Sequence, residues 1–133
     1  MKKISLFLVT LFCLGLTGCS KDAEINAFIT ELDAATKEIV AKIDANPTAA
    51  GIDEAQKAFD GKKAALKAKF QGIKEARGFQ VSADTKKKLE ESLTNNGKAL
   101  LDVSMKNAMK LAMDKDAATK FKNLLTDFQG TFT

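Results

Sequence analysis

Residues 22–45, DAEINAFITELDAATKEIVAKIDA, decide the fold more than any other stretch of this 133-residue chain. Placed at about 100° per residue, their apolar side chains gather in one arc and most charged ones fall outside it. Asn46-Pro47 follows, and proline disfavours helical geometry in the residue before it. The stretch therefore predicts an amphipathic helix over 22–45. Its apolar arc consists of Ile25, Phe28, Ile29, Leu32, Ala35, Ile39, Val40 and Ile43.

A second helix is predicted over residues 49–77, because apolar residues recur there at helical spacings. Gly61 and Gly72 weaken it by about 1 kcal/mol each relative to alanine. Gly78 is a natural residue to end it. The apolar positions of this segment are Ile52, Ala55, Phe59, Leu66, Phe70 and Ile73.

Two more helices follow the link Phe79-Gln80-Val81. Ser82 is a typical N-cap for a third helix that runs from 83 to about 112. Asn95-Asn96-Gly97 lies inside it, so the sequence allows a kink or break there. Asp116 can cap a shorter fourth helix over 116–129, which Gly130 would end. The apolar stripes are Leu89, Leu93, Leu100, Val103 and Leu111 for the third helix, and Phe121, Leu124, Leu125 and Phe128 for the fourth.

The helix pattern predicts an all-α fold, with residues 22–133 as one domain. Three long helices and a shorter C-terminal one, joined by short turns, favour an antiparallel helical bundle. The repeat of Ile25, Leu32 and Ile39 also permits an oligomeric coiled coil. Pro47 and Gly78 lie where a hairpin bundle would turn, which favours the single-chain bundle.

The N-terminal segment has the layout of a secretory signal peptide. Lys2 and Lys3 precede an apolar run over residues 4–17, and charge returns at Lys21. The run is shorter than the ~18–20 residues that a membrane-spanning helix needs. The sequence therefore predicts export, with residues 1–18 as a cleaved signal.

The end of this signal, Leu16-Thr17-Gly18-Cys19, resembles the lipobox of bacterial lipoproteins. The resemblance implies cleavage between Gly18 and Cys19, a diacylglycerol on the Cys19 thiol and often an N-acyl chain on the new amino terminus. Two or three acyl chains would anchor the protein stably. Residues 19–21 would then be the lipidated terminus and tether. The alternative is an ordinary cleaved signal that leaves Cys19 as a free thiol.

The same resemblance implies a location. Ser20, in place of an aspartate, resembles the outer-membrane default of Gram-negative lipoproteins, so the domain would face the periplasm. In a Gram-positive host the lipobox implies the outer face of the plasma membrane.

Composition argues against several classes of function. Lys and Arg number 21 and Asp and Glu 17, and without Lys2 and Lys3 the balance is 19 to 17, a net of +2. Such a mixed surface is a poor footprint for nucleic acid. The chain contains no histidine, and Cys13 would leave with the signal. The usual nucleophile–base pairs and zinc sites cannot form. We expect no enzyme, and no cofactor beyond the lipid on Cys19.

One cluster of residues suggests binding. Met105, Met109 and Met113 lie four residues apart, next to Leu101, on the side of the predicted third helix away from its leucines. The first interpretation is core packing, in which the fourth helix folds back and covers them with Phe121, Leu125 and Phe128. The second is an exposed face for a partner. The third is a thioether site for Cu(I).

These observations predict a membrane-anchored, non-enzymatic envelope lipoprotein. It would act by protein–protein interaction or as an accessory or structural subunit, and it could be an oligomer. The alternative function is a periplasmic binding protein for a small hydrophobic ligand or for Cu(I), through Met105, Met109 and Met113. Beyond residue 20 the sequence indicates no specific family.

Overall fold

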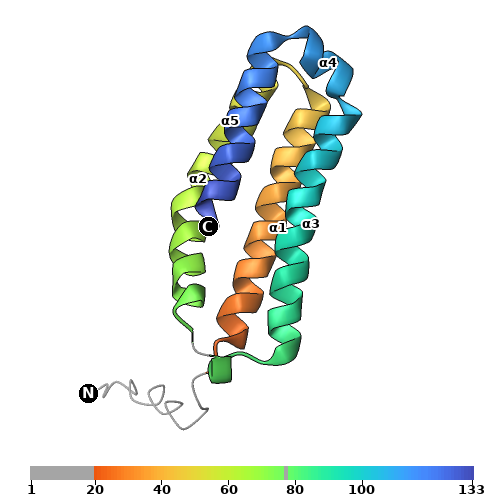
Figure 1. The fold of residues 1–133 in the computed structure, drawn as a ribbon. Coiled ribbons are helices and arrows are strands. Elements are labelled where there is room, and N and C mark those ends of the chain that lie inside the picture. The colour runs from red at the N-terminus through yellow and green to blue at the C-terminus, as the bar shows by residue number, and fades with distance from the viewer. Residues whose placement is uncertain (1–19, 77) are drawn as a thin grey trace, which may run out of the picture.

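The computed structural model describes residues 20–76 and 78–133, and these contain helices and no strand. The long helices are α1 (Asp22–Ala45), α2 (Ala49–Lys74), α3 (Ala83–Lys106) and α5 (Lys115–Thr131). A short helix, α4 (Ala108–Met113), joins α3 to α5, and a 3₁₀ turn, η1 (Gly78–Gln80), precedes α3. Consecutive long helices run in opposite directions (Figure 1). The expected all-α antiparallel bundle is confirmed.

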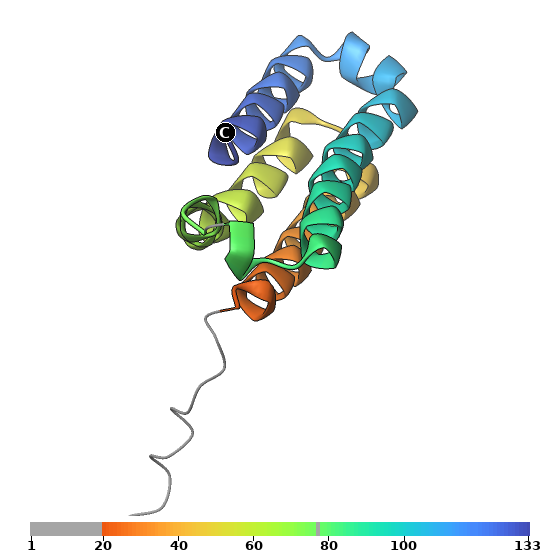
Figure 2. The same ribbon diagram turned by 60° about the horizontal axis from the view of Figure 1, so that its bottom comes forward.

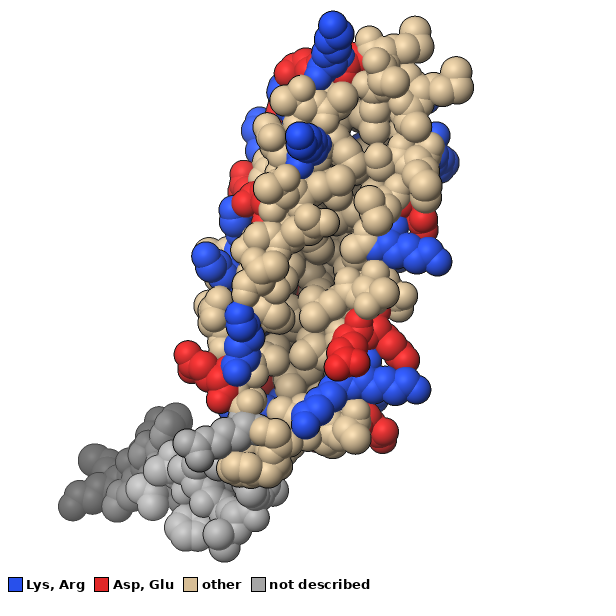
Figure 3. Space-filling model, viewed as in Figure 1, with Lys and Arg blue, Asp and Glu red and all other residues tan. Residues whose placement is uncertain are grey.

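The first hairpin closes tightly around Pro47. A Cβ on Gly51, in the first turn of α2, would lie 1.8 Å from the backbone oxygen of Asn46, so the close approach requires glycine. Along the hairpin, Lys62 pairs with Glu38 and Lys69 pairs with Glu31. Charged side chains of both signs line the outer sides of the bundle (Figure 3).

The other close helix contacts join parallel helices. α1 packs against α3 and α2 packs against α5, and each pair runs in one direction (Figures 1 and 2). The molecule thus consists of two parallel pairs, which the α1–α2 hairpin holds together in antiparallel orientation. The remaining antiparallel neighbours in the chain, α2 with α3 and α3 with α5, pack less closely than α1 with α2.

A polar ladder joins α1 to α3. Its α1 members are Asp22, Asp33 and Asp44, which lie eleven residues apart, and eleven residues make three helical turns. Asp22 Oδ1 accepts the backbone N–H of Ser82 at 2.9 Å. The other donors lie on α3 or at its C-cap. Ser92 Oγ and Asn96 Nδ2 donate to Asp33 Oδ1 at 2.7 and 2.6 Å. Lys106 Nζ and Asn107 Nδ2 donate to the Asp44 carboxylate at 2.7 and 3.4 Å. Three contact points along its length fix the register of this pair.

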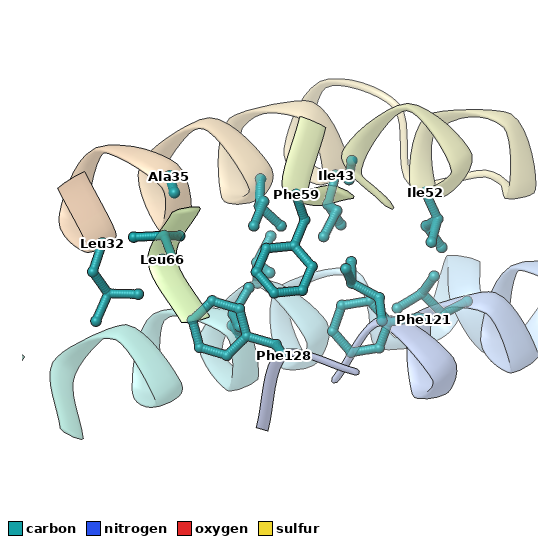
Figure 4. Close-up of a cluster of buried hydrophobic side chains, with 14 of the residues drawn as sticks. Leu32, Ala35, Ile43, Ile52, Phe59, Leu66, Phe121 and Phe128 are labelled. Atoms are coloured by element: carbon teal, nitrogen blue, oxygen red, sulfur yellow. The ribbon is translucent and has the colours of Figure 1, made fainter. Parts of the chain in front are cut away.

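A phenylalanine cluster joins α2 to α5. Phe59 lies 5.3 Å from Phe128 and Phe70 lies 5.6 Å from Phe132, between ring centroids. Phe28 of α1 completes the cluster at 5.8 Å from Phe70. Figure 4 shows Phe59 and Phe128 pointing toward one another across the core, beside Leu66 and Phe121. The predicted apolar faces of all four long helices therefore meet in one core.

The predicted coiled-coil repeat is used inside this chain. Ile25, Leu32 and Ile39 are at most 1% exposed and face the core of the bundle. Ile29 and Val40, from the same predicted arc, are only partly buried. An oligomer that used this repeat would have to open the bundle.

The sequence left open a kink or break in α3 at Asn95-Asn96-Gly97, and its prediction that this helix runs to about residue 112 was wrong. The helix continues through Asn95-Asn96-Gly97, because the Asn96 side chain is buried and bonds to Asp33 and to the Ser92 carbonyl oxygen. It breaks instead at Asn107. The N-cap prediction is confirmed, since Ser82 Oγ accepts the backbone N–H of Thr85 at 3.2 Å.

The other helix ends also differ. α2 ends at Lys74 and not at 77, and Gly78 begins η1 instead of ending α2. Asp114, and not Asp116, caps α5: its Oδ1 accepts the N–H groups of residues 116 and 117, both at 3.0 Å. α5 runs past Gly130 and ends at Thr131. A Cβ at position 130 would meet no neighbouring atom, so this position does not require glycine. Gly18 and Cys19, with the predicted cleavage and lipidation, lie outside the described residues.

Candidate functional site

The most exposed apolar surface lies at the α3–α4 end of the bundle. The methionine face, as we call it, consists of Leu101, Met105, Met109 and Met113, which are 51, 69, 81 and 87% exposed. Monomeric proteins rarely leave several large neighbouring apolar side chains in water without a function. Among the residues that the structure describes, the methionine face is therefore the leading candidate for a binding surface.

The break at Asn107 shapes this face. Both the backbone N–H and Nδ2 of Asn107 donate to the Val103 carbonyl oxygen, at 3.2 and 3.0 Å. Asn107 Nδ2 also reaches Asp44 of the polar ladder. α3 stops here and α4 continues as a separate element, so Met105 lies on α3 while Met109 and Met113 lie on α4.

Leu111 holds α4 to the bundle. It is 5% exposed and belongs to the core, next to α5. The other long side chains of α4, including both methionines, remain in solvent. α4 is thus anchored by one leucine and presents its methionines outward.

The prediction that the fourth helix folds back and covers the methionines was wrong. Phe121 and Phe128 are 5% exposed and lie in the core, and Leu125 packs against that core. α5 starts only after the Asp114 cap and then runs back beside α2, away from the methionine face. The position of that turn, which helix periodicity does not specify, leaves the methionines uncovered.

Cations border the methionine face. Lys106 bonds to Asp44 and, with Asn107, holds the pKa of that carboxyl below its usual value. Lys110 and Lys115 make no ion pair within the described part of the chain. Figure 3 shows mostly uncharged surface at the end where α4 lies, with basic and acidic side chains at its margins. The methionine face therefore offers apolar contact beside Lys110 and Lys115.

The copper interpretation assumed three thioethers on one continuous helix. The helix break separates Met105 from the other two, so that assumption was wrong. Copper binding by Met105, Met109 and Met113 stays a prediction. Within residues 20–76 and 78–133, no group of three or more histidine, cysteine, aspartate or glutamate side chains could hold a metal ion.

A depression of about 400 Å³ lies between α2 and α5. Lys63 and Asp127 form an ion pair at its edge, and Lys67, Asn123 and Thr126 line the rest. The ion pair holds the pKa of Asp127 below its usual value.

The opposite end of the bundle carries one exposed aromatic residue, Phe79 in η1, which is 83% exposed. The sequence predicts only a link over Phe79-Gln80-Val81, and nothing in it marks this ring as exposed. The described chain starts at Ser20 beside this turn (Figure 2). No helix in the described segments has both the length and the apolar character to cross a bilayer.

The fold places the chain in the class of all-α bundles with four long helices and one short one. No family model matches its sequence, and no curated protein or solved structure is significantly similar to it. The assignment of function therefore depends on the chain's own residues.

Proposed function

We propose that this chain is a lipid-anchored protein of the bacterial cell envelope. It is held in the membrane through Cys19 and acts without catalysis, by binding a protein partner at the methionine face. The observation that carries the proposal is a separation along the bundle. The N-terminal end of α1, three residues after Cys19 in the sequence, lies at one end of the bundle, and α4, which carries Met109 and Met113, lies at the other (Figure 1).

The anchor rests on the sequence Leu16-Thr17-Gly18-Cys19. A thioether-linked diacylglycerol with an N-acyl chain holds a protein far more firmly than one chain does, because each buried methylene contributes about 0.8 kcal/mol. With Ser20 after the cysteine, we place the protein in the outer membrane, facing the periplasm, in a Gram-negative host. In a Gram-positive host it stands on the outer face of the plasma membrane.

The length of the bundle supports a role in protein contact. α1 has 24 residues, and at about 1.5 Å per residue it spans roughly 36 Å. A bundle that stands on its anchored end holds the methionine face at that height, away from its own bilayer. Flexible thioether side chains adapt to irregular apolar surfaces. Lys110 and Lys115, which form no salt bridge among the described residues, favour a partner whose apolar patch has acidic side chains around it.

Palmitate-analogue labelling in cells tests the anchor. The wild-type chain should incorporate the label, and the Cys19→Ala variant should lose it. Equal labelling of the two chains would refute lipidation at Cys19.

Site-specific photo-crosslinking tests the partner contact. A photoreactive residue at position 109 should give a discrete protein adduct in intact cells, and the added substitution Met113→Lys should abolish it. A photoreactive residue at position 57, exposed on α2, is the matched control and should give none. The same adducts from both positions, or none from position 109, would contradict a partner at the methionine face.

A further inference from the structure

Phe79 is an exposed aromatic side chain at the anchored end of the bundle. It sits in the middle of η1 and is 83% exposed, slightly more than Met109 at the far end. Nothing in the core requires a phenylalanine there, since the rings of the phenylalanine cluster lie elsewhere. Burial of such a ring in an apolar environment outside the bundle would remove its surface from water and be favourable.

Hydrogen bonds attach this turn to the start of the described chain. The backbone N–H of Lys21 donates to the Gln80 carbonyl oxygen at 2.8 Å. One helical position later, Asp22 accepts the Ser82 N–H, a bond that lowers the pKa of its carboxyl. The last residue of η1 and the N-cap of α3 that follows it are therefore bonded to the N-terminal end of α1.

The tether to the lipid is very short. Cys19 precedes Lys21 by two residues, and two extended residues reach at most about 7 Å. Because Lys21 is bonded to Gln80, a lipid on Cys19 places η1 at the bilayer surface. A long flexible linker would have left the turn free of the membrane, but this chain has none between the cysteine and α1.

We propose that Phe79 inserts into the membrane interface beside the Cys19 lipid, as a second contact of the bundle with the bilayer. This inference rests on the proposed lipid anchor. Lys86 Nζ donates to the Gly78 carbonyl oxygen at 3.3 Å and makes no ion pair among the described residues, so it can face lipid phosphates. An apolar wedge with a cation beside it matches the chemistry of the interface. The contact holds the bundle upright and turns the methionine face away from the membrane.

The chain contains neither tryptophan nor tyrosine, so one introduced tryptophan reports on one position. The test compares Phe79→Trp with the matched control Met109→Trp, which is 81% exposed at the opposite end. Each full-length lipidated protein is reconstituted in vesicles of phosphatidylethanolamine and phosphatidylglycerol, with or without bromine on the acyl chains. The expected result is a blue shift and loss of most emission in brominated vesicles for Phe79→Trp, with neither change for Met109→Trp.

The outcomes separate this inference from the anchor. If neither protein floats with the vesicles, the proposed anchor fails. If both float and the tryptophan at 79 stays unquenched, the inference is overturned and the anchor stands. Quenching at both positions would show a bundle lying flat on the bilayer, which also overturns it. Circular dichroism of each variant in detergent, matching the wild type, ensures that the tryptophans report on the folded bundle.

Discussion

The two parallel helix pairs are held by different chemistry. α1 and α3 are joined by the polar ladder, in which aspartates eleven residues apart meet Ser92, Asn96, Lys106 and Asn107. α2 and α5 are joined by the phenylalanine cluster, whose rings lie 5.2–6.0 Å apart. Apolar burial is strong and tolerant of small shifts, whereas hydrogen bonds to fixed positions specify one register. Polar contacts join α2 to α5 as well, through Lys120 with Asp53 and Gln56 with Asp127, so the two pairs differ in degree. Ring packing is concentrated between α2 and α5, and hydrogen bonds at three levels set the register of α1 and α3.

The largest effect should come from the phenylalanine cluster. Phe59→Ala removes a fully buried ring and its contact with Phe128, which should lower the free energy of unfolding by about 3–5 kcal/mol. Urea unfolding followed by circular dichroism measures this. Phe79→Ala is the matched control, because that ring is exposed, and it should change stability by no more than about 0.5 kcal/mol. Equal losses in the two variants would refute the assignment of Phe59 to the core.

Breaking the polar ladder should lower the free energy of unfolding by less, and it should disturb the register of α3 against α1. Asn96→Ala removes the 2.6 Å bond to Asp33 and should lower the free energy of unfolding by about 1.5–3 kcal/mol, as expected for a bond to a charged group. The larger change should appear in the order of α3, as broadened amide resonances around residue 96. The neighbouring Asn95→Ala, exposed on the same helix, is the control and should have little effect. A sharp, unchanged spectrum for Asn96→Ala would show that the ladder does not set alignment.

Asn96 and Asn107 show how far the sequence could predict the fold. The helical periodicity of residues 22–45 and the Ser82 cap are local signals, and both predictions are confirmed. Asn96 and Asn107 look alike locally, yet one lies inside a helix and the other ends it. The difference depends on their environment in the bundle, which a window of sequence does not contain. A signal was present, because Asp22, Asp33 and Asp44 repeat at the same eleven-residue interval as Leu89, Leu100 and Leu111.

The candidate site was predicted only in part. The sequence identified Met105, Met109 and Met113 as a group, but it predicted that the fourth helix would cover them. Their exposure depends on the turn at Asp114, which sends α5 toward α2. The direction of a helix after a short turn is set by long-range packing, here by Phe121 and Phe128 entering the core. Phe79 was missed for a related reason: nothing local distinguishes an exposed ring in a link from a buried one.

Acid should loosen the ladder more than the phenylalanine cluster. Bonds from Ser82 to Asp22 and from Lys106 to Asp44 hold the pKa values of both carboxyls below their usual range. Their stabilising contribution is therefore fully present above the unfolded-state pKa values and is lost as pH falls through the lowered folded-state pKa values. With no histidine in the chain, stability should be nearly constant between about pH 5.5 and 8.

Amide hydrogen exchange at decreasing pH checks this difference, once rates are corrected for intrinsic exchange. Protection in α3 should fall before protection in α5. One carboxylate on α5, Asp127, also has a lowered pKa, so Asp127→Asn is the control and should leave the early loss in α3 unchanged. Simultaneous loss in both helices, in the wild type, would contradict separate chemistry for the two pairs.

The smallest effect concerns a polar group that neither pair uses. Thr36 is 2% exposed on the inner side of α1, and its hydroxyl has no hydrogen-bond partner among the described residues. A buried hydroxyl without a partner carries an uncompensated desolvation cost, and valine has nearly the same shape. Thr36→Val should therefore raise the free energy of unfolding by about 0.5–1 kcal/mol. Thr30→Val on the same helix removes a hydroxyl that donates to the Asn26 carbonyl oxygen at 3.0 Å in solvent, and it should be nearly neutral. A destabilised Thr36→Val chain would mean that this hydroxyl is bonded in solution, and the ladder would then have a polar neighbour inside the core.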